Sequence, residues 1–511
     1  MLERANGGMT MDNEPFYLES CKRYIEDEEQ AGMMKKLIEL HPYASMIYTH
    51  DDIGTATLIA DLYDNSIRYC PQYDAWYIWD GSRWAKQTEA GNISDKVQTV
   101  LNLLLLYCKE LSLTVGEDEL KPYTKYCNSI RKNTAINNII AMLKTMVRLS
   151  ATDFDADPYL LNTPACAYNL KTMETVPDRE SRNLTQVTTC NLNTLAKPCK
   201  RWYSFIDQIM SHDKEKAAFL QRALGYSLLG INREECMFIA YGSQTRNGKG
   251  TLFSSIQSAL GSEYMGGSDP MLICEAKNGK SIDFNSPQPA LRKLVNTRLV
   301  NISEIKREQQ IDASALKAMT GRDTLTTRGL FEGSFDFVPQ YSIWVNTNYL
   351  PAISDDTVFK SDRIWVITFD ESFTENNRDR DLKEIFQSEE NRPTILKWLI
   401  DGCTDYFKNG LNPPDCVRKA TADYRLKYDR IGNFIKDCCT IGDGLKVQRG
   451  DLYNAYRSWC CRAENRYKPL GTTSFYGEIE FRGFPITKGH RDFFVRGIDL
   501  MSENEDDAQN A

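Results

Sequence analysis

Lys249 and the glycine-containing loop before it are the first residues in this sequence whose types and spacing could do chemistry. Residues 236–241 form a short apolar run, residues 242–248 read as a loop, and residues 252–260 have helical spacing. A loop that joins a strand to a helix turns backbone N–H groups and the positive end of the helix dipole toward an anion. Lys249 adds a full positive charge, so the segment predicts a phosphate-binding loop.

The loop departs in two ways from the usual phosphate-binding pattern. Five residues, not four, separate Gly242 from Gly248, and Gly250 follows Lys249 where a serine or threonine usually binds Mg²⁺. Thr251, one position further on, takes that metal role or binds a phosphate oxygen. The alternative is an ordinary strand–turn–helix unit with a surface lysine. The residues predicted to bind the nucleotide are Gly242, Arg246, Asn247, Gly248, Lys249, Gly250 and Thr251.

Two later apolar runs end in polar side chains that could complete a nucleotide site. Residues 298–304 read as a strand that delivers Glu304 to the carboxyl edge of a parallel sheet, where such sheets bind ligands. A carboxylate there can orient the attacking water and help to hold Mg²⁺ through water. Residues 340–348 read as a third strand, and the amide of Asn348 can contact the γ-phosphate or the water. The alternatives are a solvated glutamate and a turn-forming asparagine.

Bulk composition indicates a soluble protein of two to four domains, because 511 residues are too many for one core. There is no run of 18 apolar residues, so no membrane partner is expected. With four histidines and no Cys-x-x-Cys pair a zinc site is not expected, and a reduced cytoplasmic compartment fits the 15 cysteines. The net charge of −8 argues against a uniformly basic nucleic-acid coat but not against DNA in a local channel.

The flanking regions predict elements that position the loop. Residues 67–84 read as strands around an Asp-Gly turn, and their aromatic residues favour a buried hairpin face over a nucleic-acid stacking surface. Residues 92–150 are largely helical, and residues 202–229 read as two helices that lead into the loop strand.

The C-terminal part is basic. Residues 411–500 hold 16 Lys and Arg against 11 Asp and Glu, whereas residues 501–511 are acidic. Helices followed by a β-pattern over residues 475–500 favour a winged-helix DNA-binding module, and the alternative is a helical cap with solvated charge.

Together these segments resemble the superfamily 3 helicases, and more closely the phage, plasmid and poxvirus primase–helicase family. Four ordered elements carry the resemblance: the Asn-Gly-Lys loop, the strand ending in Ser303-Glu304, the segment of residues 316–323 with the hairpin after it, and the strand ending in Asn348, with Arg363 beyond it. Further likeness, in the hairpin near residue 80 and in residues 159–162, 219–228 and 451–460, extends the resemblance over about nine-tenths of the chain.

The resemblance implies a ring-forming, AAA+-like motor that hydrolyses ATP with Mg²⁺ and translocates on DNA. In such a motor Lys249 and Thr251 bind the phosphates and the metal, Glu304 is the catalytic acid and a metal ligand, and Asn348 senses the γ-phosphate. Arg363 is the arginine that reaches the ATP of a neighbouring subunit. The residues that face DNA in the central pore are Lys317, Arg322 and Arg328.

The expected fold is α/β, with an AAA+-like P-loop NTPase core of the superfamily 3 helicase type. The core is flanked by an N-terminal α+β helicase-associated domain and a C-terminal winged-helix-like domain. The expected division is a lead-in at residues 1–45, the helicase-associated domain at 46–200, the ATPase domain at 201–408, the winged-helix-like domain at 409–500 and an acidic tail at 501–511.

The leading interpretation is an ATP hydrolase and DNA helicase that replicates a phage, prophage or other mobile element in the cytoplasm of a bacterial host cell. The expected partners are single-stranded or forked DNA, further copies of the chain in a ring, with a hexamer expected, and a separate primase or polymerase. No primase activity is expected, because little chain precedes the helicase-associated region. The alternatives are an ATP-regulated origin-binding initiator with little unwinding activity and, less favoured, a small-molecule phosphotransferase.

Overall fold

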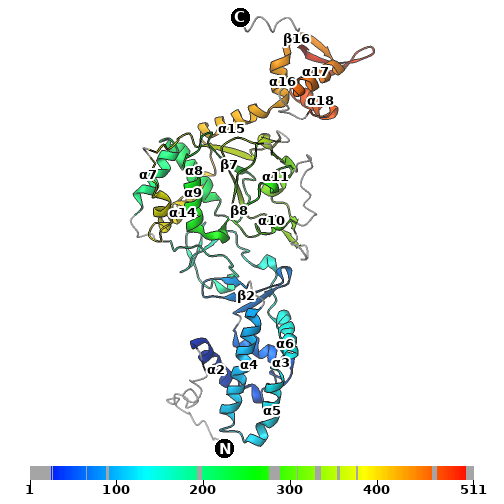
Figure 1. Ribbon diagram of the computed structural model, residues 1–511. Coiled ribbons are helices and arrows are strands. Elements are labelled where there is room, and N and C mark those ends of the chain that lie inside the picture. Colours follow the sequence, from blue (N-terminus) through cyan, green and yellow to red (C-terminus); the bar gives the residue numbers. More distant parts are fainter. Residues whose placement is uncertain are drawn as a thin grey trace, which may run out of the picture.

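The computed structural model is elongated, with a helical N-terminal unit, a central α/β core and a small C-terminal unit arranged along one axis (Figure 1). It describes residue 25 and residues 27–64, 66–87, 91–192, 198–275, 288–307, 309–327, 335–353, 357–375, 378–462 and 469–501. Among these residues, no helix combines the length and the apolar character that crossing a membrane requires.

The N-terminal unit is a bundle of helices with its own apolar core. Its helices are α2 (Glu28–Leu40), α3 (Asp52–Leu62), α4 (Gly91–Leu111), α5 (Glu117–Ser129) and α6 (Asn133–Met146). Helix α4 buries the predicted apolar stripe, including Val97, Val100 and Leu104. Met34 and Leu37 of α2 are fully buried in the same core. The part of the chain expected to be a lead-in therefore contributes to the first domain from residue 28 onward.

Two small antiparallel sheets connect this bundle to the core. One has strands β1 (Ile67–Cys70), β2 (Ala75–Trp79) and β3 (Trp84–Lys86), and the other has β4 (Leu160–Asn162), β5 (Ala167–Asn169) and β6 (Thr175–Val176). Trp84 is fully buried and Tyr77 nearly so, in a cluster with Phe154. The preference for a buried hairpin face over an aromatic stacking surface is thus confirmed for these side chains.

A five-stranded parallel sheet forms the centre of the molecule. Its strands are β7 (Met237–Tyr241), β8 (Met265–Ser268), β9 (Leu299–Ser303), β13 (Ser342–Thr347) and β15 (Ile364–Thr368), in the spatial order β15-β7-β13-β9-β8. Strand β13 therefore lies between the strand before the loop and the strand that ends at Ser303. Most residues of β7, β9, β13 and β15 are buried, as expected when helices cover both faces of a parallel sheet, whereas the edge strand β8 is largely accessible.

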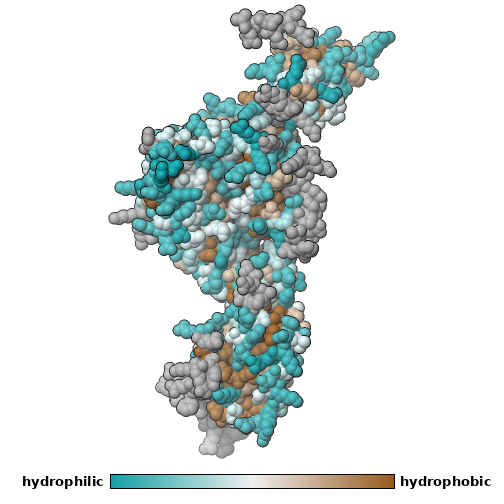
Figure 2. All heavy atoms as spheres, viewed as in Figure 1, coloured by the Kyte–Doolittle hydropathy of each residue, from teal (hydrophilic) through white to brown (hydrophobic). Residues whose placement is uncertain are grey.

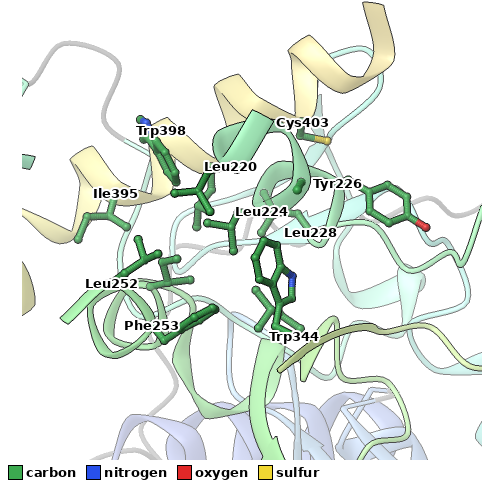
Figure 3. Packing of buried hydrophobic residues seen from close by; sticks show 14 of the residues in the cluster. Leu220, Leu224, Tyr226, Leu228, Leu252, Phe253, Trp344, Ile395, Trp398 and Cys403 are labelled. Carbon is green, nitrogen blue, oxygen red and sulfur yellow. The ribbon is translucent and has the colours of Figure 1, made fainter. Parts of the chain in front are cut away.

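Alternate strand residues enter two separate cores. On one face Phe238 and Trp344 pack against α7 (Lys200–Ile209), α8 (Lys214–Tyr226), α9 (Lys249–Tyr264), α13 (Leu382–Gln387) and α14 (Arg392–Asn409). Figure 3 shows Trp344 pointing toward Leu224 and Leu228, with Phe253 nearby. On the other face Ile239 and Val345 pack against α10 (Pro289–Arg292), α11 (Ala313–Thr320), α12 (Thr357–Lys360) and α15 (Asp415–Tyr428).

Helix α15 belongs to the core and corrects the predicted domain boundary at residue 409. Tyr424 is fully buried on the sheet, and its hydroxyl donates to the Pro351 carbonyl at 2.7 Å. Thr421 accepts a hydrogen bond from the Val366 amide of β15 at 3.0 Å. The C-terminal unit therefore begins with α16, and α15 connects it to the core (Figure 1).

The C-terminal unit combines three helices with a three-stranded antiparallel sheet. Its elements are α16 (Arg430–Cys438), β16 (Cys439–Gln448), α17 (Arg449–Arg462), α18 (Thr472–Phe481), β17 (Ile486–Lys488) and β18 (Phe493–Leu500), and the strand order is β16-β18-β17. The β-pattern expected from residue 475 onward is wrong up to residue 481. Phe475 and Ile479 are spaced by one helical turn, and both are buried on the same face of α18.

The short elements around the core are a two-stranded pair and a hairpin. The strands β10 (Gln310–Ile311) and β14 (Ala352–Ile353) pair in parallel. The strands β11 (Leu325–Thr327) and β12 (Phe335–Phe337) pair antiparallel, as the predicted hairpin after Gly321 requires. The tip of that hairpin lies outside the described residues.

Gly225 is required where α8 crosses α14. A Cβ at this position would lie 2.1 Å from the backbone nitrogen of Cys403 and 2.3 Å from the backbone carbon of Gly402. We expect Gly225→Ala to lower the free energy of unfolding of the core by about 1–3 kcal/mol, because helix backbones must separate to admit the methyl group. Denaturant unfolding of the full chain measures the change.

Gly32→Ala is the matched control for this prediction. Gly32 is exposed in the middle of α2, and a Cβ there meets no heavy atom within 4 Å. Its replacement removes backbone freedom from the unfolded chain, so it should stabilise the protein by up to about 1 kcal/mol. Equal changes in the free energy of unfolding for Gly225→Ala and Gly32→Ala would contradict the close crossing of α8 and α14.

Candidate active site at the carboxyl edge of the sheet

The ends of three adjacent strands are aligned at one edge of the parallel sheet. Tyr241 of β7 pairs with Thr347 of β13, and Ser303 of β9 pairs with Asn346 of β13. The loop after β7, Asn348 and Glu304 therefore leave the sheet side by side. Because neighbouring strands lie about 4.8 Å apart, Glu304 follows a strand roughly 10 Å from the loop strand. The edge thus brings together the loop, the acid and the amide that the sequence predicted.

The loop holds Lys249 in a buried position at the first turn of α9. Gly248 precedes it with φ 86°, in the left-handed region that favours glycine. A Cβ at Gly248 would also lie 2.4 Å from Ile209 of α7. The position therefore needs glycine for its backbone angle and for the close approach of α7.

The Lys249 ammonium points back toward the strand ends. Its Nζ donates to the side-chain oxygen of Asn348 at 3.0 Å and lies 3.5 Å from the Gly242 carbonyl oxygen. The side chain is only 4% exposed, and burial lowers the pKa of Lys249 to about 8. No carboxylate forms an ion pair with it in the part of the chain that the structure describes, so its charge is available to an anion.

Of the other predicted loop residues, Asn247 stabilises the loop, whereas Arg246 and Gly250 are exposed. The Asn247 side-chain amide donates to the Gln244 carbonyl at 2.6 Å, which stabilises the loop from inside. Arg246 is exposed with φ 59° and lies 3.9 Å from a Glu375 carboxylate oxygen. Gly250 is exposed, and a Cβ there would meet no heavy atom within 4 Å. Asn247 therefore shapes the loop, and Arg246 stands at its rim.

Glu304 and Thr251 lie on different sides of the site. Glu304 is exposed directly after β9, in a left-handed conformation with φ 62°. Non-glycine residues in this conformation are uncommon and often mark functional positions. Thr251, in the first turn of α9, lines a cavity on the α7 side of the loop. No contact joins Thr251 to Glu304 among the described residues.

The cavity beside the loop was not anticipated from the sequence. Its volume is about 300 Å³, and its lining combines two aromatic rings with several cations. The residues that line it are Phe205, Gln208, Arg246, Gly248, Thr251, Phe373, Arg378, Asp379, Arg380, Leu382 and Lys383. The sequence signal is the cluster of charged residues after Phe373, which follows the last sheet strand without any apolar periodicity.

Lys216 is a second buried lysine near this edge that the sequence did not reveal. It lies on α8, its side chain is 6% exposed, and its Nζ is 3.0 Å from Asp370 Oδ2. Asp370 follows Phe369, whose backbone amide donates to the Tyr241 carbonyl at 2.6 Å. The pair connects α8 to the chain directly beside the loop strand.

Arg363 lies at the amino ends of the parallel strands, whereas Lys249 lies at their carboxyl ends. It precedes β15, and its guanidinium donates to Glu235 Oε2 at 2.9 Å and to Thr320 Oγ1 at 3.1 Å. Within one subunit it is therefore not part of the site around the loop. Its predicted role toward a neighbouring subunit stays a prediction.

Arg322 and Lys317, two of the predicted DNA-facing residues, also lie away from the loop. Arg322 donates to the Arg233 carbonyl at 2.8 Å and lies 3.7 Å from Glu235. Lys317 is half-buried on α11. Arg328 lies outside the described residues. The position of these side chains relative to DNA stays a prediction.

Two regions of the chain match known protein families. Residues 56–211 match the family described as D5 N terminal like, and residues 426–481 match the family described as poxvirus D5 protein-like. These matches flank the loop, Glu304 and Asn348 on both sides. The two matches support a D5-like primase–helicase family with a helicase part for this chain.

Relatives of this D5-like chain carry helicase names and come from viruses. A protein named as a helicase in Acanthamoeba polyphaga mimivirus is 24% identical over 75% of this chain and 43% of its own length. Another, from Frog virus 3, is 22% identical over 53% of this chain and 29% of its own. The chain thus spans less than half the length of the curated relatives that it matches. These named viruses give no support to a bacterial host cell, which stays a prediction.

Solved structures that resemble the D5-like chain include C-terminal regions of a protein called NrS-1. One, described as the A form apo structure, covers 88% of this chain and 99% of that chain, at 10% identity with a TM-score of 0.43. Another, of residues 305–718 of that protein, covers 60% of this chain and 78% of that chain, at 13% identity with a TM-score of 0.35.

Proposed function

We propose that this D5-like chain is an ATP-dependent DNA helicase that works as a ring of identical subunits in DNA replication. The single observation that carries the proposal is the contact of Lys249 with Asn348 at the aligned strand ends. A buried lysine at a helix N-terminus, next to a polar side chain on the neighbouring strand, suits a site that binds the terminal phosphates of a nucleotide. The two family matches and the helicase names of relatives support the same conclusion.

The phosphates would bind at the start of α9. Backbone N–H groups of the first turn and the helix dipole attract the anion, and Lys249 supplies its full charge to the β- and γ-phosphates. One Nζ proton of Lys249 is donated to the side-chain oxygen of Asn348. When a γ-phosphate enters, Lys249 can turn its remaining donors to it, and the Asn348 amide group can report its presence.

Hydrolysis would use Glu304 as the acidic residue whose carboxylate orients the water and accepts its proton as a general base. The water attacks the γ-phosphorus, the bond to the β-phosphate oxygen breaks, and a proton passes from the water to the Glu304 carboxylate. A strand separates β9 from the loop strand, which leaves room for the γ-phosphate and the water between them.

The carboxyl edge of the sheet suits Mg²⁺ because the exposed side chains there offer oxygen atoms as ligands. Exposed Ser303 and Glu304 can bind its water ligands, as Mg²⁺ prefers. When bound, the metal neutralises charge on the phosphates. Thr251 lines the cavity instead of facing Glu304, which favours a phosphate oxygen as its partner.

The cavity beside the loop suits the base and ribose of the same nucleotide. Phe205 and Phe373 offer aromatic surface for a purine, and Thr251 and Gly248 connect the cavity to the phosphate loop. The exposed Arg246 and the cations after residue 377 suit an anionic ligand.

The AAA+-like core and the winged-helix-like unit are supported by topology. Strand β13, which carries Asn348, lies between the loop strand and the Glu304 strand, an order expected of such a core. The C-terminal unit has the helix–strand–helix–helix–hairpin order of a winged helix. Lys317, Arg322 and Arg328 would face single-stranded or forked DNA in the pore of a hexamer, and a separate primase or polymerase would be a further partner. The replicon is a phage, prophage or other mobile element, among which the viral relatives favour a virus.

Removing the two central groups should separate binding from hydrolysis. We expect Lys249→Ala to reduce DNA-stimulated ATP turnover by roughly 10²-fold or more, because it deletes the cation on the transferred phosphoryl group. Glu304→Gln should still bind ATP but hydrolyse it slowly, since the amide cannot accept the proton. Steady-state ATPase and equilibrium nucleotide binding measure the two effects.

The exposed neighbours Lys214 and Glu215 provide matched controls on α8. Lys214→Ala and Glu215→Gln remove the same charges and should leave turnover unchanged. Near-normal turnover in Lys249→Ala would overturn the nucleotide site. Strong ATPase with sequence-specific duplex binding but no fork unwinding would favour the origin-binding initiator instead.

Nucleotide affinity should depend on pH through Lys249. Its pKa of about 8 means that the free protein carries the charge below pH 8 and loses it above. Bound phosphates favour the charged form, so binding takes up one proton above pH 8. The dissociation constant of a non-hydrolysable ATP analogue should therefore rise about tenfold per pH unit from pH 8 upward. Titrations between pH 7 and pH 9.5 measure the slope.

Lys249→Arg is the control for this slope, because a guanidinium stays charged throughout the range. Its affinity should be nearly independent of pH, whatever its absolute value. A flat profile in the parent protein would show that Lys249 is not the group that meets the phosphates.

Mixing two inactive variants should reveal a site shared between subunits. If Arg363 completes the ATP site of a neighbour, Arg363→Ala and Lys249→Ala subunits together should recover part of the ATPase activity. The gain would come from interfaces at which the subunit that keeps Lys249 meets the subunit that keeps Arg363. An arginine supplied in trans contributes roughly 10³–10⁵ in rate in other nucleotide hydrolases.

Glu235→Gln controls for the loss of the ion pair with Arg363. It weakens the same contact but keeps the guanidinium, so it should retain most of the activity if Arg363 acts on ATP. A strictly monomeric protein with full ATPase activity would contradict the shared site.

A further inference from the structure

The hairpin of the C-terminal unit carries positive charge, whereas its last helix carries none. Helix α18 contains no Lys or Arg and carries Glu478 and Glu480. In contrast, residues 486–496, which form the hairpin of β17 and β18, hold three Lys or Arg and one acid, Asp492. A helix that entered a DNA groove would bring two carboxylates toward phosphates, so its charge disfavours that arrangement.

Two cations face each other across the outer side of the sheet. Lys446 of β16 is the direct cross-strand partner of Arg496 of β18. Like charges in such a pair repel each other and destabilise the sheet. Arg496 Nε donates to Thr487 Oγ1 at 2.9 Å, and Lys446 Nζ lies 5.5 Å from the centre of the Phe494 ring. The pair is thus held in place on the surface without a carboxylate between its members.

The tip of the hairpin carries an exposed aromatic ring on the other face of the sheet, beside further cations. Phe493 is 44% exposed and pairs across the strands with Lys488, and the Arg449 guanidinium lies 5.8 Å from its ring centre. Arg449 also stacks 4.0 Å over Tyr476. Lys488 and Arg491 are exposed beside it.

The outward end of the C-terminal unit is covered by hydrophilic residues (Figure 2). Arg449 and Lys488 lie on the same side of the sheet as the exposed Phe493 ring, with Arg491 in the turn beside them. Lys446 and Arg496 lie on the opposite face beside Phe494, so the five cations cover both faces of the hairpin. None of the five forms an ion pair with an acid in the described part of the chain.

We propose that this hairpin binds single-stranded nucleic acid, with the backbone along its cations and one unpaired base stacked on Phe493. Phosphate contacts supply sequence-independent attraction, and base stacking on an aromatic ring requires an unpaired base. The inference rests on the proposed DNA-dependent function and specifies which surface of the C-terminal unit meets the strand. Helix α18, with its neutral and acidic exposed face, stays outside the contact.

The test titrates the 511-residue chain into a fluorescent single-stranded oligonucleotide of mixed sequence or into the matching duplex. The fluorescence anisotropy of the nucleic acid reports binding. Lys488→Ala with Arg491→Ala should weaken single-strand binding and reduce the slope of log affinity against log salt by about 1.4, since roughly 0.7 is lost per phosphate contact. Phe493→Ala should weaken it by roughly tenfold, and Phe493→Trp should restore it.

Thr473→Glu with Ser474→Glu is the matched control on α18, where both side chains are exposed. It adds negative charge to the helix and should leave single-strand affinity unchanged. Weaker binding in this control with none in the hairpin variants would overturn the inference, as would a parent protein that prefers duplex. All variants keep the ATPase site, so normal ATPase with unchanged hairpin variants refutes the hairpin alone. A parent without ATPase activity or nucleic-acid binding refutes the proposed function as well.

Discussion

The register of β7, β13 and β9 is the constraint on which the candidate site depends. Tyr241 and Thr347 end their strands together, so the loop lysine emerges directly beside Asn348. A shift of the register would separate these groups, because each residue adds about 3.3 Å along a strand. The register is held by apolar side chains that alternate between two cores, so the packing of both sheet faces fixes the position of Lys249.

Burial gives Lys249 its chemical character. An ammonium group that keeps few water contacts is destabilised, which lowers its pKa, and an entering phosphate removes that penalty by supplying the missing charge. The Asn348 oxygen partly compensates for the missing water in the free state. The same hydrogen bond couples the lysine to the strand that leads from the β11–β12 hairpin, so a change at the phosphate can reach the predicted DNA-facing element through β13.

The predicted elements with strong local signals agree with the structure, and the misses have local causes. The strand before the loop, the helix after it and the helix that ends at Gly321 follow from apolar spacing and glycine. Helix α18 was missed because Tyr476 and Phe481 favour strands, whereas the buried pair Phe475 and Ile479 decides for a helix.

Residues whose role depends on tertiary contacts could not be found from the sequence. Phe205 and Phe373 are 168 positions apart and meet only because α7 packs under the loop while the chain after β15 returns to it. Lys216 was likewise hidden, since a lysine in a helix gives no sign that Asp370 will face it. The cavity and the Lys216–Asp370 pair are formed by segments that lie outside the sheet and next to the loop strand. The proposed phosphate loop can be recognised from a few adjacent residues. The cavity proposed for the base is assembled from distant residues, and only the packing of α7 and of the chain after β15 around the loop reveals it.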